Sequence, residues 1–233
     1  MQVQLGAAKV PKYATRESGD TLEIIERPQG GLSAVLVDGQ RSGRNAKIIS
    51  NIVARKAISL LGEGVRDGAA ARAAHDYLVT HRSGQVSAEL VILSVDLKTR
   101  TLVISRNSRC PAHVWREGAL IPLDTESQPV GIRDFTKPAI CELPISVGTY
   151  VVAHTDGLDA LARLAGEGSL DAILTAGAHE RASAQEIADR LLSAALALEQ
   201  GRPTDDISVL VLAVLAEAPL DGARRLTASF PFV

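Results

Sequence analysis

Residues 18–39 read SGDTLEIIERPQGGLSAVLVDG, a stretch in which two short apolar runs flank a turn sequence. The runs cover residues 22–25 and 32–37. Between them stands Pro28-Gln29-Gly30-Gly31, where Pro fixes φ at one corner and Gly permits positive φ at the next. The pattern predicts a β-hairpin. Because the outer ends of two antiparallel strands lie side by side, Asp20 and Asp38 should be neighbours.

Two further aspartates stand at the ends of apolar runs much later in the chain. They are Asp156 in His154-Thr155-Asp156-Gly157 and Asp205 in Thr204-Asp205-Asp206-Ile207. Carboxylates at strand edges can converge in space, and converged carboxylates repel one another unless protons or cations neutralise them. Hard oxygen ligands of this kind suit Mg²⁺ or Mn²⁺. The spacing therefore favours a metal-dependent hydrolase.

The composition excludes several other classes of protein. The 233 residues are 46% hydrophobic, enough for one buried core, and only 3% aromatic, so that core should consist mainly of aliphatic side chains. The net charge of -2 attracts neither nucleic acid nor an anionic membrane, and no apolar run is long enough to span a bilayer. Two cysteines make no disulfide framework. We expect a cytoplasmic protein.

The remaining periodicity predicts strands in adjacent runs with helices grouped between them. This arrangement favours an α+β fold over a parallel doubly wound sheet. Residues 117–138 are rich in Pro, Gly and charge and are expected to form a loop. Ser183 and Glu186 have the spacing of a capping box at the start of a helix. Strands are expected at 88–95, 101–105, 112–115, 149–155 and 207–215, and helices at 49–61, 65–79, 158–165, 169–177 and 183–198.

Taken in order, these motifs resemble the protein phosphatase 2C superfamily, specifically its bacterial branch typified by stage II sporulation protein E. The resemblance covers about residues 18–212 and implies a two-sheet antiparallel β-sandwich with helices on both outer faces. Residues 1–216 would form a single phosphatase domain, and residues 217–233 an extension packed on the domain or on a partner. The matching motifs are Ser18-Gly19-Asp20, Val37-Asp38-Gly39-Gln40-Arg41-Ser42-Gly43, Asn107, Pro129-Val130-Gly131-Ile132, Thr155-Asp156-Gly157-Leu158 and Asp205-Asp206-Ile207-Ser208.

The resemblance also implies a role for each acidic residue. Asp38 would bridge two Mn²⁺ or Mg²⁺ ions, the Gly39 carbonyl would bind one of them, and Asp20 would complete that second site. Asp156 and Asp205 would hold the first ion. A water between the metals would attack phosphorus in line, so Asp38 and Asp156 are the expected catalytic residues. Asp206 is expected to support the site without binding a metal.

Two positions depart from the pattern of related proteins. Gln40 stands where many eukaryotic relatives carry a histidine that can protonate the leaving group. Arg41 replaces the middle glycine of Asp-Gly-x-Gly-x-Gly, and we expect it to be exposed, although it could bind the substrate phosphate.

The resemblance implies hydrolysis of phosphoserine or phosphothreonine on a bacterial regulatory protein such as an anti-sigma-factor antagonist or a stressosome component. The chain is similar to short, free-standing members of the branch. A pseudophosphatase that binds a partner without catalysis is the alternative, and a nuclease or phosphodiesterase is disfavoured by the charge. The oligomeric state stays open.

Simpler interpretations apply to single residues. A lone Asp-Gly is usually a turn in which Gly has positive φ. His154 is expected to pair with a neighbour, and Cys110 and Cys141 to be small buried residues. His75, His81 and His179 are expected at the surface.

Overall fold

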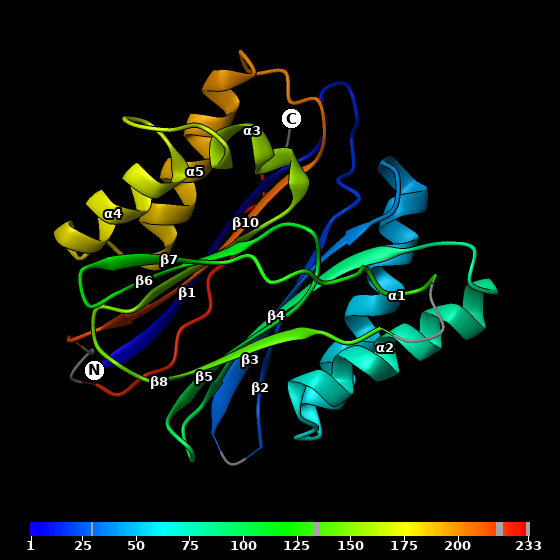
Figure 1. Ribbon diagram of the computed structural model, residues 1–233, viewed down its shortest axis with the longest axis horizontal. Helices are drawn as coiled ribbons and strands as arrows, with labels where there is room; N and C mark the ends of the chain where they lie inside the picture. Colours follow the sequence, from blue (N-terminus) through cyan, green and yellow to red (C-terminus); the bar gives the residue numbers. More distant parts are fainter. Residues whose placement is uncertain (29, 133–135, 218–220, 232–233) are drawn as a thin grey trace.

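The computed structural model describes residues 1–28, 30–132, 136–217 and 221–231. Within them the chain forms four layers, with two antiparallel sheets packed face to face and helices on both outer faces (Figure 1). This confirms the expected α+β sandwich. In these residues no helix is both long and apolar enough to cross a membrane.

The first sheet contains the predicted hairpin. Thr21 pairs with Val37, so Asp20 and Asp38 lie at the same end of the sheet, as expected. Of the turn that joins the two strands, Gln29 lies outside the described residues. The strand order is β2-β3-β4-β5-β8, with bounds β2 (Thr21–Glu26), β3 (Gly31–Gly39), β4 (Ala88–Asp96), β5 (Thr101–Asn107) and β8 (Ala139–Pro144).

The second sheet joins the two ends of the domain. Its first strand pairs with its last, from Gln2 opposite Leu215 to Val10 opposite Ile207. The strand order is β1-β10-β9-β6-β7, with bounds β1 (Gln2–Val10), β10 (Ile207–Leu215), β9 (Tyr150–His154), β6 (Ala112–Arg116) and β7 (Ala119–Leu123).

Two groups of helices cover the sandwich. Helices α1 (Gly43–Gly62) and α2 (Asp67–Arg82) pack on the first sheet. On the second sheet lie η1 (Asp156–Leu158), α3 (Asp159–Ala162), α4 (Leu170–Glu180) and α5 (Ala184–Leu198). The capping box predicted at Ser183 and Glu186 is present at the start of α5.

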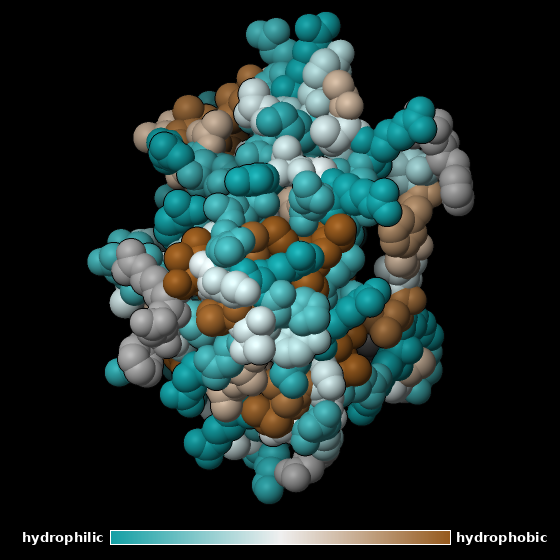
Figure 2. All heavy atoms as spheres, turned by 90° about the vertical axis from the view of Figure 1, so that its right-hand side faces the viewer, coloured by the Kyte–Doolittle hydropathy of each residue, from teal (hydrophilic) through white to brown (hydrophobic). Residues whose placement is uncertain are grey.

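Three apolar clusters hold the layers together, and they are built mainly from Val, Leu, Ile and Ala. One lies between the sheets, where Leu36 and Leu93 face Val151 and Leu212. The other two lie under the helices on each side, and Trp115 belongs to one of them. Figure 2 shows that the face at the right of Figure 1 is mostly hydrophilic, with apolar residues in separate patches.

Residues 117–138, predicted as a loop, contain strand β7, and that prediction was wrong. Glu117 and Gly118, with φ of 54° and 79°, form a tight two-residue turn that pairs β7 with β6. The strand escaped notice because it is short, half exposed and carries Pro122, which is tolerated at a sheet edge. Residues 133–135 of the segment lie outside the described residues.

His75 was expected at the surface, and this was wrong as well. The side chain is only 4% exposed, and its Nδ1 accepts a hydrogen bond from the Gly131 N–H at 3.0 Å. It thereby fixes the Pro129–Ile132 segment, whose Val130 also pairs with Ala88 at the start of β4.

Candidate active site

The aspartates singled out in the sequence come together at one end of the sandwich, and hydrogen bonds join them across the two sheets. Asp20 Oδ2 accepts hydrogen bonds from the hydroxyls of Ser208 at 2.6 Å and Thr155 at 3.0 Å. Asp206 Oδ2 accepts one from the Gly19 N–H at 2.8 Å. These bonds therefore fix the residues just before β2, in the first sheet, against the end of β9 and the start of β10, in the second sheet.

Asp38 stands at the centre of this acidic cluster. Burial, together with the charges of the neighbouring carboxylates Asp20, Asp156, Glu89 and Asp205, raises its pKa to about 9. A carboxyl group in this position retains its proton unless positive charge arrives. The cluster is therefore built to receive cations.

Asp20 is almost completely buried, with 1% of its surface exposed. Burial raises its pKa to about 7, against the lowering effect of the hydrogen bond from Ser208. Its carbonyl oxygen accepts hydrogen bonds from the ammonium groups of Lys47 at 2.5 Å and Lys9 at 3.1 Å. Burial and the neighbouring Lys9 lower the pKa of Lys47 to about 8.

Asp156 and Asp205 form the more open side of the cluster. Burial and the charge of Asp205 raise the pKa of Asp156. Asp205 Oδ1 accepts a hydrogen bond from the Asp206 N–H at 2.9 Å. Asp206 itself is buried, and its two carboxylate oxygens accept hydrogen bonds from the backbone N–H groups of Lys12 and Gly19. A supporting role for Asp206, without metal binding, agrees with these contacts.

Gly39 and Gly157, which follow Asp38 and Asp156, allow a neighbouring backbone segment to pack closely against them. A Cβ on Gly39 would lie 2.1 Å from the Ala46 carbonyl oxygen of α1, and one on Gly157 would lie 2.2 Å from the Asp206 carbonyl oxygen. Neither glycine has positive φ. The common explanation of Asp-Gly as a tight turn therefore does not hold at these two positions.

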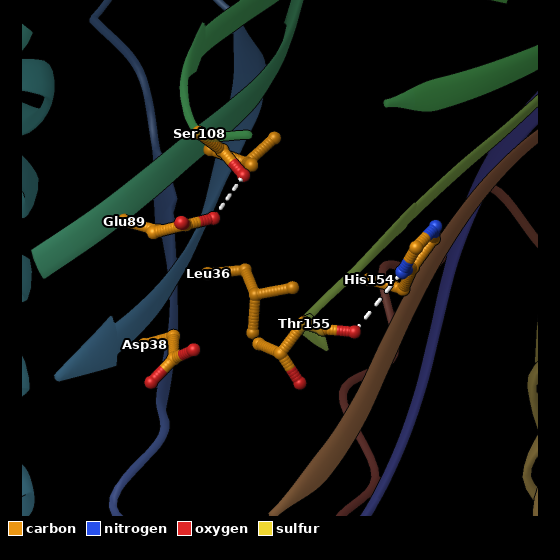
Figure 3. A pocket seen from close by; sticks show the side chains of 7 residues that line it. Leu36, Asp38, Glu89, Ser108, His154 and Thr155 are labelled. Carbon is orange, nitrogen blue, oxygen red and sulfur yellow. Dashed lines mark hydrogen bonds between the residues drawn. The ribbon is translucent and has the colours of Figure 1, made fainter. Parts of the chain in front are cut away.

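Glu89 is a site residue that the sequence interpretation missed. It lies directly opposite Asp38 in the pairing of β4 with β3. Figure 3 shows both carboxylates beside a small pocket, with Thr155 approaching from the other sheet. Glu89 accepts hydrogen bonds from the Ser108 hydroxyl and from Arg109 Nε, each at 2.6 Å. In the sequence, Glu89 could have been noticed only as a single carboxylate at the start of the otherwise apolar strand β4.

Thr155 and Ser208 were also missed as functional residues, although both lie inside the quoted motifs. Their hydroxyls hold Asp20, and Thr155 Oγ1 in turn accepts the Ser208 N–H at 3.0 Å. A hydroxyl beside an aspartate is too common in sequences to identify such a contact.

The two departures from the related pattern lie at the rim of the site. The side chain of Gln40 accepts the Ser87 N–H at 3.1 Å, which ties it to the chain before β4. Arg41 is exposed, as expected, and has a φ of 76°. Asn107 is buried, and its amide donates to the Gln128 carbonyl oxygen, so it positions the loop beside the site.

The donor set of the cluster consists of carboxylate oxygens. Ligands of this type fit Mg²⁺ or Mn²⁺, because both prefer oxygen. The raised pKa of Asp38 is a further sign of fit, since bound cations would compensate for its burial and for the repulsion from the neighbouring carboxylates.

Comparison with known families identifies this arrangement. The model of the family described as stage II sporulation protein E (SpoIIE) matches residues 28–215, well over half of the chain. The chain belongs to the SpoIIE family. A comparison with curated proteins gave no match.

Solved structures confirm the fold. The PP2C phosphatase domain of SpoIIE from Bacillus subtilis, with a fragment of its regulatory domain, is 20% identical with a TM-score of 0.77, over 92% of this chain and 64% of that chain. The catalytic domain of the serine/threonine phosphatase PstP, in complex with two manganese ions, is 16% identical with a TM-score of 0.70, over 91% and 98%. The RsbU and RsbW domains of a Mycobacterium tuberculosis protein are 17% identical with a TM-score of 0.72, over 93% and 61%. The fold is that of PP2C-type phosphatases.

Proposed function

We propose that this SpoIIE-family chain is a metal-dependent protein phosphatase that hydrolyses phosphoserine or phosphothreonine on a bacterial regulatory protein. The observation that carries the proposal is the convergence of Asp38 with four other carboxylates, contributed by both sheets. A charge cluster of this size is expensive in metal-free protein, and divalent cations would repay that cost.

Two divalent ions, Mn²⁺ or Mg²⁺, would be held by Asp20, Asp38, Gly39, Asp156 and Asp205. When bound, such ions lower the pKa of a coordinated water and neutralise charge on phosphoryl oxygens. Asp38, near the end of β3 and among the other carboxylates, would contribute carboxylate oxygens to the metal site. Asp156, on the open side, would face the substrate.

Other residues of the chain would orient the side chains that bind the metal ions. Ser208 and Thr155 hold the carboxylate of Asp20, which restricts its rotation before any ion arrives. Arg109 lies at the rim with 74% of its side chain exposed, and its pairing with Glu89 raises its pKa. Its guanidinium is placed to attract an incoming phosphate.

The proposed substrate is a phosphorylated protein and not a small molecule. Only 3% of the residues are aromatic, so few rings are available to stack on a phosphotyrosine or a nucleobase. One structure of this fold is described in connection with the bacterial stressosome, and another contains RsbU and RsbW domains. A regulatory phosphoprotein of that kind, in the cytoplasm, is the class of partner we propose.

The test compares phosphate release in Mn²⁺ from phosphoserine, phosphothreonine and phosphotyrosine peptides and from a phosphorylated anti-sigma-antagonist-like domain. We expect slow hydrolysis of the first two peptides, little of the third, and much faster hydrolysis of one cognate phosphoprotein. A clear preference for phosphotyrosine or for a phosphodiester would remove the signalling role. Absence of turnover on every substrate, with Mn²⁺ bound, would favour the pseudophosphatase.

A further inference from the structure

A second group of potential metal ligands lies next to the acidic cluster but does not belong to it. Cys110 is in the loop between β5 and β6, His154 is the last residue of β9, and Asp159 is the first residue of α3. One ligand atom from each lies within 4.8 Å of the others. Among the described residues this is the one group of three or more His, Cys, Asp or Glu side chains that is so close together.

His154 is prepared for metal binding by its own hydrogen bond. Its ring is 2% exposed, and Nδ1 lies 3.0 Å from the Thr155 carbonyl oxygen. A carbonyl oxygen only accepts, so Nδ1 carries the proton and Nε2 carries a free lone pair. Among the described residues, Nε2 has no hydrogen-bond partner. Metal-binding histidines characteristically donate their other ring N–H to a carbonyl or carboxylate.

A second buried histidine adds to this unpaired polarity. The ring of His113 lies 5.7 Å from that of His154, and within the part of the chain that the structure describes neither of its nitrogens has a partner in hydrogen-bonding geometry. Its Nδ1 does lie 3.3 Å from Asp171 Oδ1 on α4, which can orient the ring. The buried Nε2 of His154 therefore calls for an explanation, and an ion bound to it would supply one.

The distance between the other two ligands, Cys110 and Asp159, also suits a shared metal ion. Cys110 Sγ lies 3.8 Å from Asp159 Oδ1, close to the separation of two ligands on one tetrahedral ion. The backbone of Cys110 is fixed, because its carbonyl oxygen accepts a hydrogen bond from the buried guanidinium of Arg106 at 2.7 Å. The side chain of Asp159 is 32% exposed, and its Oδ2 pairs with Arg163, so Oδ1 is the oxygen that faces Cys110 and would bind an ion.

We propose that Cys110, His154 and Asp159 form a binding site for one borderline-soft divalent cation, with Zn²⁺ as the best fit. Sulfur, imidazole nitrogen and a single carboxylate are the ligands that Zn²⁺ prefers, whereas Mg²⁺ and Mn²⁺ prefer the all-oxygen cluster. The two centres would therefore select different metals. Zn²⁺ would also tie the loop after β5 to the turn that carries Asp156, which should stabilise the fold.

The test uses Co²⁺ as a spectroscopic substitute for Zn²⁺ on the full chain, in thiol-free buffer under argon, with Mg²⁺ in large excess to occupy the oxygen cluster. We expect one equivalent of Co²⁺ to produce a sulfur-to-cobalt charge-transfer absorption and Zn²⁺ to remove it. Zn²⁺ should raise the unfolding temperature of the same Mg²⁺-loaded protein.

Variants separate this site from the acidic cluster. Cys110→Ser, a nearly isosteric change, should abolish the charge-transfer band and the thermal shift. Cys141→Ser, the matched control at the other free cysteine, should keep both. Asp38→Asn should keep the band whether or not the protein is a phosphatase. Wild-type protein without the band, or Cys110→Ser with it, would overturn the proposal.

Discussion

At the scale of single residues, the carboxyl group of Asp38 should make the stability of the metal-free protein depend on pH. Its pKa in the folded chain is about 9, because it is buried among other carboxylates, against about 4 for an unfolded aspartate. Between these values the folded state holds a proton that the unfolded state releases. The free energy of unfolding of the metal-free protein should therefore fall as the pH rises from about 4 to about 9.

Asp38→Asn should remove this pH dependence. We expect the metal-free variant to be more stable than the wild type at pH 7 to 9, and its phosphatase activity to be lost. Urea unfolding in chelator at pH 5, 7 and 9 measures the first effect. Asp76→Asn, at an exposed position on α2, is the matched control and should behave like the wild type. Equal pH slopes in Asp38→Asn and the wild type would contradict the assignment of the raised pKa.

Ser208 acts on the site through Asp20. Ser208→Ala removes the 2.6 Å hydrogen bond to Asp20 Oδ2 and should weaken activation by Mn²⁺ about 10- to 100-fold. Turnover at saturating Mn²⁺ should recover, because no proposed ligand is lost. The cost in stability should be about 1 kcal/mol. Activity measured across a Mn²⁺ titration tests this, with the exposed Ser59→Ala as control. A lower maximal rate with an unchanged Mn²⁺ requirement would refute it.

At the scale of elements, the contact of β3 with α1 depends on Gly39. Gly39→Ala would place a methyl group 2.1 Å from the Ala46 carbonyl oxygen, so the helix must move. We expect a loss of about 1–3 kcal/mol in unfolding free energy. Gly62→Ala, in the last turn of α1, is the control, because its Cβ meets only Ile25 at 3.3 Å and Ala favours the helix. Thermal or urea unfolding of both variants decides, and equal stabilities would contradict this packing explanation.

The elements that the sequence predicted differ physically from those it did not. Strand β10 is buried along almost its whole length and could be predicted as 207–215 from apolar residues alone. Strands β1, β7 and β8 were not predicted, and all three lie at sheet edges, where polar and apolar residues mix. The remaining edge strand, β2, was found because the turn at Pro28 and Gly30 marks its hairpin.

The residues of the site also divide into those that the sequence could predict and those that it could not. Aspartates at the ends of buried strands could be predicted to converge, since strand ends are placed by the sheet. Glu89 could not be, because its position opposite Asp38 depends on the register of β3 with β4. The hydroxyls of Thr155 and Ser208 require contact between the two sheets, which local sequence patterns do not encode.

At the scale of the whole molecule, the described residues after 216 stand out because all of them are exposed. Residues 221–231 are exposed, with Leu226 at 79% and Phe230 at 75%, and Arg224 pairs with Glu26 at 2.5 Å. Residues 218–220 and 232–233 of the predicted extension lie outside the described residues. Docking of this tail on the domain or a partner stays a prediction.

Removal of residues 217–233 tests that prediction. We expect unchanged hydrolysis of p-nitrophenyl phosphate, because the acidic cluster lies elsewhere, and a higher KM for a cognate phosphoprotein if the apolar tail contacts it. Steady-state kinetics of the full chain and the truncated chain on both substrates provide the measurement. Unchanged kinetics on the phosphoprotein, with unchanged thermal stability, would exclude both forms of docking.

We propose that the acidic cluster binds two divalent cations and hydrolyses phosphate esters only with them. The most direct measurement follows Mn²⁺ binding by calorimetry and p-nitrophenyl phosphate hydrolysis on the same metal-free protein. We predict two bound ions, activity that rises with their binding and vanishes in chelator, and loss of activity in Asp156→Asn. Full activity in excess chelator, with the absence of metal confirmed by elemental analysis, would contradict the claim.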